Sequence, residues 1–358
     1  MTWTFRTVAG LAALVALWLA AAAPAHALRS HPVTRPTLAL IDRRCFYAPA
    51  PSAWWPLAPR QSPHQIRAGF NDTHGEDPMY AHTGVDVSTS IDRAPVYAMT
   101  SGVIGDEVTG GAFPHLRIGP FFYYHVIPRL PAGTYVSRGT WIGDIRHGDH
   151  HVHITEIEPG CGILDPRRPG GPLRDPTNTE HPTVEDLSAD VANTAAYRVF
   201  PAWRTPDPAQ PLALNHLHGV VDFRAEVFDM PVRRTRMWPQ QPLMVAAVRS
   251  WLAPLDQKWR GYGHTITAYD GSTWMSTTSA YYAVMAHGSV HVRTCFVNPS
   301  RPCDNRYILH VAGLGFDTRH FPDRWYHYCV SALTIRNRRT TKCWQVRIQN
   351  HPRRSPGG

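Results

Sequence analysis

The stretch APVYAMTSGVIGDEV, residues 94 to 108, alternates apolar and polar side chains and is interrupted by glycine. Alternation with a period of two is typical of a β-strand that has one face against a core. Three similar runs follow at residues 115–126, 133–145 and 151–158, each separated from the next by a segment containing glycine or proline. Short strands at this spacing predict a mainly antiparallel β-sheet domain, which we assign to residues 28–164.

A change in composition follows this first domain. The segment DPRRPGGPLRDPTNTEHP, residues 165–182, is rich in proline and glycine, which disfavour regular pairing, and we predict a linker over residues 165–185. Further alternating runs predict a second all-β domain over residues 186–350, a β-sandwich that resembles immunoglobulin-like or fibronectin-like domains. Residues 183–195 fit either a helix or a strand followed by a loop. Residues 351–358 are predicted to be a disordered tail.

The chain begins with a short basic segment, an apolar run and the small-residue stretch Ala25-His26-Ala27. This order is typical of a secretory signal peptide, so we predict cleavage after Ala27. A membrane anchor is the alternative, but the apolar run is about 17 residues long and is followed by Pro24. No later segment is apolar enough to span a bilayer. The mature protein is therefore expected to be secreted, extracellular or associated with the cell wall, with no stable membrane insertion.

The six cysteines are predicted to form disulfides, because the compartments outside the cytosol are oxidising. Sequence alone permits 15 connectivities. Chain geometry favours one of them, in which Cys329 and Cys343 face each other across a β-hairpin. The other pairs would be Cys295 with Cys303, around a short loop, and Cys45 with Cys161.

The formal net charge of +9 indicates a polyanionic neighbour. No basic run with interleaved aromatics resembles a nucleic-acid surface, and export also argues against nucleic acid. Anionic polymers of a cell wall are the partner that we expect.

Four short motifs carry groups that can bind a metal or move a proton. His82 and Asp86 stand four residues apart in HTGVDV, and an extended chain would place them about 13 Å from each other. A bend at Gly84 would bring them together. His151 and His153 in HVH project from one face of a predicted strand, so one imidazole can bind a metal while the other reaches a water on it. His125 lies on a separate run.

A rival set repeats both spacings in NHLHGVVDF. His216, His218 and Asp222 would lie along one apparently straight strand of about 20 Å, too long for a single zinc ion with bonds near 2 Å. We interpret this set as a coincidence. The first set draws its groups from distant segments, and two histidines with one carboxylate are a common catalytic zinc set.

The order HTGVDV, APVYAMTSGVIG, YYHV, GTYVSRGTWIGDI and HVH resembles the M23, lysostaphin-type family of zinc metallopeptidases over residues 78 to 158. The resemblance implies that His82, Asp86 and His153 bind one zinc ion and that His125 and His151 serve catalysis. It also implies hydrolysis of peptide bonds in bacterial peptidoglycan, in cross-links or stem peptides.

Zinc would lower the pKa of a bound water, and a histidine near its ordinary pKa of about 6.5 can accept the proton. We assign this base role to His151, with His125 orienting water or stabilising the oxyanion, although the two roles could be exchanged. The sequence departs from the family at Thr155, where an acidic residue is usual, with Glu156 one place later. The segment between Val103 and His125 is also short.

These departures support an alternative function, a non-catalytic wall-binding or scaffold protein with a degenerate metallopeptidase fold. The retention of all five histidine and aspartate positions argues against it. Tryptophans of the second domain could stack on sugars, but aromatic side chains more often serve as core.

Overall fold

The computed structural model describes residues 31–34, 49–50, 53–70, 73–74, 80–174, 180–191, 211–229, 243, 245–257, 260–266, 308–310, 316–336 and 338–351. The predicted signal peptide, Cys45, Cys295, Cys303 and most of the predicted tail lie outside these residues. Over the described ranges the protein is all-β with antiparallel sheets, as predicted, and it contains no α-helix. In the same ranges, no helix is both long and apolar enough to cross a membrane.

The N-terminal half is organised around an eight-stranded sheet, which we call the central sheet. Its main strand order is β11-β7-β8-β9-β13-β5-β2, with β14 paired to β13. A three-stranded sheet, β10-β12-β6, and the β3-β4 pair accompany it. The bounds are β2 (Ile66–Ala68), β3 (Thr73–His74), β4 (Tyr80–Ala81), β5 (Val85–Ser88), β6 (Pro95–Tyr97), β7 (Gly102–Val108), β8 (His115–Ile118), β9 (Phe121–Tyr124), β10 (Val126–Pro128), β11 (Tyr135–Val136), β12 (Trp141–Ile145), β13 (His151–Glu158) and β14 (Gly162–Leu164).

Strand β13 lies between β9 and β5 and is buried on both faces for most of its length. Val152 and Ile154 have no exposed surface and belong to the hydrophobic core. Because side chains alternate along a strand, His151, His153 and Thr155 project from the opposite face. The apolar alternation that predicts the strand therefore also places the motif histidines on one side of the sheet.

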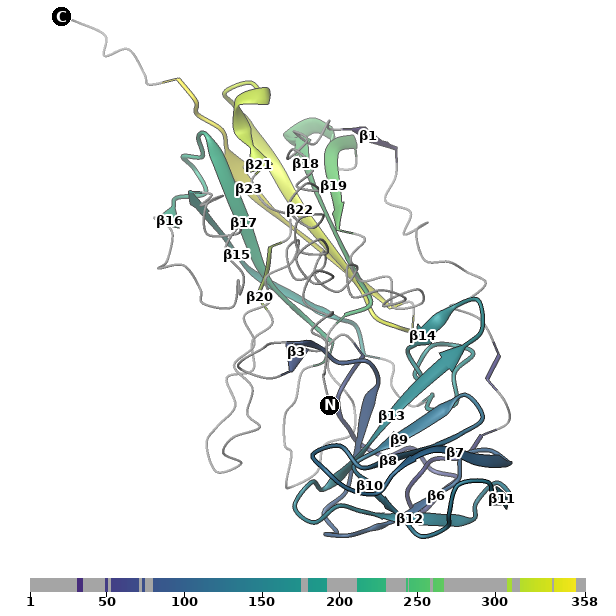
Figure 1. Ribbon diagram of the computed structural model, residues 1–358. Coiled ribbons are helices and arrows are strands. Elements are labelled where there is room, and N and C mark those ends of the chain that lie inside the picture. The colour runs from purple at the N-terminus through teal and green to yellow at the C-terminus, as the bar shows by residue number, and fades with distance from the viewer. Residues whose placement is uncertain are drawn as a thin grey trace, which may run out of the picture.

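The C-terminal half contains two further antiparallel sheets (Figure 1), with strand orders β1-β19-β18-β22-β23 and β16-β15-β17-β20, and with β21 paired to β17. Their elements are β1 (His31–Thr34), β15 (Thr183–Val191), β16 (Pro211–Leu212), β17 (Val220–Phe228), β18 (Ala247–Pro254), β19 (Arg260–Ile266), β20 (Ile308–His310), β21 (Phe316–Asp317), β22 (Trp325–Leu333), β23 (Arg339–Arg347) and the 3-10 helices η2 (Leu255–Gln257) and η4 (Thr318–His320). Strand β1 comes from the range that we assigned to the first domain, yet it pairs with β19.

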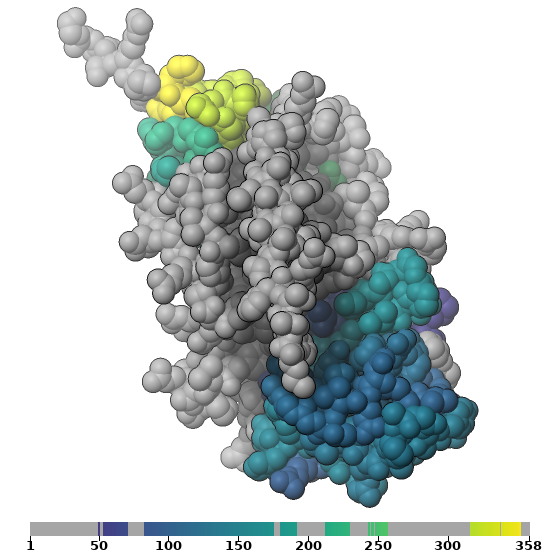
Figure 2. All heavy atoms as spheres, in the orientation of Figure 1, coloured from purple at the N-terminus to yellow at the C-terminus, as the bar shows by residue number. Residues whose placement is uncertain are grey.

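Aromatic side chains join these two sheets. Phe223 of β17 and Tyr328 of β22 stack with their ring centroids 3.9 Å apart, and Phe316 packs against Phe223. These aromatic side chains exclude water from the space between the sheets. Burial of apolar surface is the main favourable contribution to the free energy of such packing. Figure 2 shows the described residues of the N-terminal sheets in blue and teal at the lower end of the molecule.

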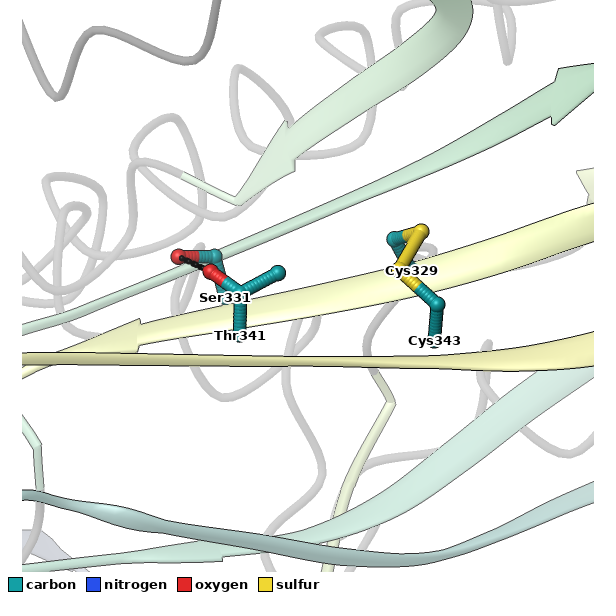
Figure 3. Close-up of a disulfide and its surroundings, with 4 residues drawn as sticks. All are labelled: Cys329, Ser331, Thr341 and Cys343. Atoms are coloured by element: carbon teal, nitrogen blue, oxygen red, sulfur yellow. Dashed lines mark hydrogen bonds between the residues drawn. A yellow bond between two sulfur atoms is a disulfide. The ribbon is translucent and has the colours of Figure 1, made fainter. Parts of the chain in front are cut away.

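The predicted hairpin disulfide is confirmed. Cys329 of β22 and Cys343 of β23 are direct cross-strand partners and are bonded to each other. Two residues along each strand, the hydroxyl groups of Ser331 and Thr341 lie 3.0 Å apart in a hydrogen bond (Figure 3). Cys161 is also disulfide-bonded, and its partner lies outside the described residues.

Part of the segment predicted as a linker is packed rather than extended. Leu173, Arg167 and Arg168 are buried. The guanidinium of Arg168 donates to both carboxylate oxygens of Glu156, at 2.6 and 2.8 Å, and both side chains are almost fully buried. The helix-or-strand ambiguity at residues 183–195 is resolved as a strand, β15, over Thr183–Val191.

Candidate metal centre

Three ligand atoms from His82, Asp86 and His153 converge at one buried point. Nε2 of His82 lies 3.0 Å from Oδ1 of Asp86, Nδ1 of His153 lies 3.1 Å from the same oxygen, and the two nitrogens are 2.6 Å apart. All three residues are at most 8% exposed. Among the described residues, this is the one group of histidine, cysteine and acidic side chains placed to hold a metal ion.

Two elements produce this convergence. Asp86 is the second residue of β5 and is the direct cross-strand partner of His153 on β13, so both side chains project from the same face. His82 precedes β5 and is separated from it by a bend at Thr83 and Gly84. The expected bend at Gly84 therefore exists, and it carries the His82 side chain back toward Asp86.

The φ angle of Gly84 lies outside the left-handed region, so its backbone conformation alone does not require glycine. Glycine is needed at this position for space. A Cβ atom at this position would lie 2.2 Å from the carbonyl oxygen of Ile154 and 2.7 Å from Nε2 of His153. Real Cβ atoms do not approach backbone so closely. Close packing of the bend against β13 is thus possible only without a side chain.

The second ring nitrogen of each candidate histidine ligand also has a partner. Nδ1 of His82 is 2.8 Å from the carbonyl oxygen of Gly69, which can only accept, so this nitrogen carries the proton and Nε2 is left with its lone pair. Nε2 of His153 is 2.8 Å from the hydroxyl of Thr155. Such outer partners fix the ring orientation of metal-binding histidines. Thr155 stands at the position where M23 peptidases, which the sequence resembles, usually have an acidic residue, and Glu156 turns away to Arg168.

Charge around the centre favours an ionised carboxylate and neutral imidazoles. Burial acts to raise the pKa of Asp86, but His151, His82 and His153 hold it well below its ordinary value. Burial lowers the pKa of His153 to about 4, against an opposing effect of Asp86. At neutral pH the site thus offers an anionic oxygen and a neutral His153 imidazole, and a divalent metal requires an ionised carboxylate and neutral imidazoles as ligands.

The donor set fits a zinc ion in composition and burial. Ligand bonds of 2.0 to 2.2 Å in a tetrahedral arrangement separate the ligand atoms by about 3.4 Å. The two distances to the Asp86 oxygen, 3.0 and 3.1 Å, are slightly shorter than this separation, and the 2.6 Å between the two nitrogens is shorter still. An increase of less than an ångström in these distances would admit the ion. Three protein ligands would leave the fourth coordination position of the ion for water or substrate.

His151 and His125 lie beside this centre. Nε2 of His151 is 3.5 Å from Oδ2 of Asp86, and Nδ1 of His151 donates to the carbonyl oxygen of Asp149 at 2.5 Å. The ring of His125 is 4.5 Å from that of His151, centroid to centroid. Burial lowers the pKa of His151 to about 3 despite the nearby Asp86. A neutral His151 therefore directs the lone pair of Nε2 toward the centre.

The prediction that the rival set lies along one straight strand is wrong, because only Asp222 belongs to a strand. His216 and His218 precede β17 and are exposed, with their ring centroids 5.4 Å apart, whereas Asp222 lies within β17 and is buried. These three residues do not form a candidate metal group. The interpretation of this repeat as a coincidence agrees with that geometry.

Comparison with protein-family models, with curated proteins and with solved structures finds no match to this chain. The likeness to M23 peptidases thus depends on the order of the motifs and on the site described above.

Several neighbours of the centre were not expected from the sequence. Arg67 of β2 places Nε 3.6 Å from Oδ2 of Asp86 and donates from another nitrogen to the carbonyl oxygen of Asp149 at 3.2 Å. Asp149 and Arg146 lie in the loop before β13. Asp149 could have been found from the sequence, because it is an acidic residue two places before HVH. The carbonyl group of Gly69 could not, because every residue has a backbone carbonyl.

Proposed function

We propose that this chain is a secreted zinc metalloendopeptidase of the M23 type, which hydrolyses peptide bonds in bacterial peptidoglycan. The observation that carries the proposal is the convergence of His82, Asp86 and His153, from motifs in the family's order, with a neutral His151 directed at the same point. The net charge of +9 and the predicted signal peptide suit an enzyme of an anionic cell wall.

In this proposal, His82, Asp86 and His153 hold the metal and leave one position for water or substrate. When bound, zinc polarises a scissile carbonyl and lowers the pKa of a coordinated water toward about 7. The residues of the chain then have separate tasks. His151 accepts a proton at Nε2, because its Nδ1 already donates to the carbonyl oxygen of Asp149. Burial lowers the pKa of His151 to about 3, so it is a weaker base than the ordinary imidazole expected from the sequence.

His125 is placed to assist, because its ring lies 4.5 Å from that of His151, centroid to centroid. Its backbone has a φ of 64°, which is uncommon for a residue with a Cβ atom. His125 lies between β9 and β10, and its backbone conformation interrupts the regular alternation of side chains along these strands. We assign His125 to orienting water or to stabilising the oxyanion of the tetrahedral intermediate.

The test is digestion of purified peptidoglycan by the mature, zinc-loaded protein, with new amino termini as the readout. We expect release of amino termini by the wild type and none after chelation. His151→Ala should retain about one zinc ion per chain and lose turnover. His153→Ala should lose the zinc. His147→Ala is the matched control, because His147 lies in the neighbouring loop, is exposed and contacts Asp92 instead of the centre.

No amino termini from walls of several chemistries would refute the hydrolase proposal. Tight wall binding by a protein without stoichiometric metal would favour the scaffold alternative. Loss of zinc in His151→Ala would make His151 a ligand and remove it from the base role.

A further inference from the structure

We propose that Asp149 is a positioning residue that holds His125 with its carboxylate and His151 with its backbone carbonyl. This inference rests on the function proposed above, since it concerns the two histidines assigned to catalysis there. Oδ2 of Asp149 lies 3.3 Å from Nδ1 of His125. The carbonyl oxygen of the same residue accepts the Nδ1 proton of His151 at 2.5 Å. One residue thus contacts both rings.

The Asp149 carboxylate is itself fixed from the other side. Arg146 donates from Nε to Oδ2 at 2.7 Å and from a terminal nitrogen to Oδ1 at 2.9 Å, a two-bond contact that sets the plane of the carboxylate. The backbone nitrogen of Arg146 donates to the carbonyl oxygen of His125 at 2.7 Å. Arg146, Asp149 and His125 therefore form a closed cycle of contacts.

The contact with His125 is close but has no well-aligned hydrogen bond. Nδ1 of His125 is buried and has no aligned hydrogen-bond partner among the described residues, so the Asp149 carboxylate is the charged group that faces it. An anion at this distance gives an electrostatic preference to the ring orientation that turns Nδ1 toward it.

A second path connects Asp149 to the metal ligands. The Asp149 carbonyl accepts from Arg67 at 3.2 Å, and Nε of Arg67 lies 3.6 Å from Oδ2 of Asp86. A displacement of the loop would therefore change the hydrogen bond of His151 and the surroundings of Asp86 together. Contacts of this type outside a catalytic group typically change activity about 10-fold to 100-fold when they are removed.

The test compares zinc-loaded Asp149→Asn, which keeps the shape and removes the charge, with the wild type at one neutral pH. Arg146→Lys removes the two-bond contact without altering Asp149 and provides the test if the first variant does not fold. Asp92→Asn is the matched control. Asp92 also holds this loop, through His147 and Gly148, but it contacts neither catalytic histidine.

Four quantities are measured: the histidine ring signals, kcat, KM and the zinc content. Long-range proton–nitrogen NMR of the histidine rings, assigned with His125→Gln and His151→Gln, reports which ring nitrogens carry protons. We expect Nδ1-protonated His151 in the wild type and shifted ring signals of both histidines in Asp149→Asn. We also expect a kcat that is about 10-fold to 100-fold lower, a KM within about twofold and an unchanged zinc content. The control variant should match the wild type in all four.

Unchanged ring signals in both test variants, or a kcat within about twofold of the wild type, would overturn the positioning role while the hydrolase assignment stands. If the wild type cleaves no wall but the rings respond to Asp149→Asn, the hydrolase assignment fails and the positioning role is supported.

Discussion

Replacement of Gly84 by alanine should damage the candidate metal centre without replacing a ligand. The new Cβ atom would lie 2.2 Å from the carbonyl oxygen of Ile154, about 1.2 Å short of the 3.4 Å at which ordinary contact begins. Because the opposing atom belongs to the backbone of β13, no side-chain rotation relieves the clash. The bend and β13 must separate, and His153 moves with β13.

Two magnitudes follow from this displacement. Forced overpacking costs about 1 to 3 kcal/mol of stability. Metal sites tolerate errors of about 0.2 Å in ligand position, so a shift of about an ångström exceeds that tolerance several times over. We expect zinc affinity to fall by at least about tenfold, comparable to the loss of an outer partner.

The assay is competition for zinc with a chromophoric chelator, paired with urea denaturation of the metal-free protein. Gly105→Ala is the matched control, because Gly105 also lies in a strand of the central sheet and a Cβ atom there meets nothing within 4 Å. It should keep wild-type affinity and change stability by less than about 1 kcal/mol. Wild-type zinc affinity and stability in Gly84→Ala would refute the close-approach argument.

Three further outcomes are expected. Glu156→Ala should lower the free energy of unfolding by about 3 to 5 kcal/mol, because it leaves the buried Arg168 guanidinium without its carboxylate. Asp106→Asn, which alters an exposed ion pair, should cost at most about 1 kcal/mol in the same urea titration, and equal losses would contradict this difference. The metal-free protein should lose stability as pH falls from about 7 toward 4, by at most about 1.4 kcal/mol per pH unit for each histidine. Burial lowers the pKa of His151 to about 3 and of His153 to about 4, so between about pH 6.5 and these values only the unfolded chain takes up the two protons. Greater stability at pH 5 than at pH 7 would contradict the expected loss of stability. Zinc at about 100 times its dissociation constant should add about 2.7 kcal/mol to the free energy of unfolding, and a midpoint that does not respond to chelation would exclude a bound metal.

The all-β fold could be predicted from the sequence because it depends on local pattern, whereas the grouping of His82, Asp86 and His153 was implied by the resemblance to M23 peptidases. Alternation along β13 places His151 and His153 on one face, and the glycine in HTGVDV permits the bend that returns His82 to Asp86. The hairpin disulfide followed from the symmetric spacing of Cys329 and Cys343, which the register reproduces.

The contacts outside the centre could not be predicted in the same way. The carbonyl oxygen of Gly69 becomes a partner of His82 only through the tertiary path of the chain, and carbonyls carry no sequence signal. The role of Gly84 was only partly predicted. Backbone freedom was the expected reason for glycine at the bend, whereas the structure shows that the close approach to Ile154 leaves no room for a side chain. The packed start of the predicted linker depends on Arg168 meeting Glu156, twelve residues earlier on the far face of β13.

The departure at Thr155 has a consistent electrostatic consequence. A carboxylate partner raises the basicity of a metal-binding imidazole, whereas the hydroxyl of Thr155 fixes the orientation of His153 without adding charge. The nearby acid that could have supplied this charge, Glu156, is neutralised by Arg168 on the opposite face. The carboxylate that lies near the histidines is instead Asp149, which is paired with Arg146 and faces His125. A carboxylate therefore contacts one of the histidines assigned to proton transfer, whereas the outer partner of His153 is a neutral hydroxyl.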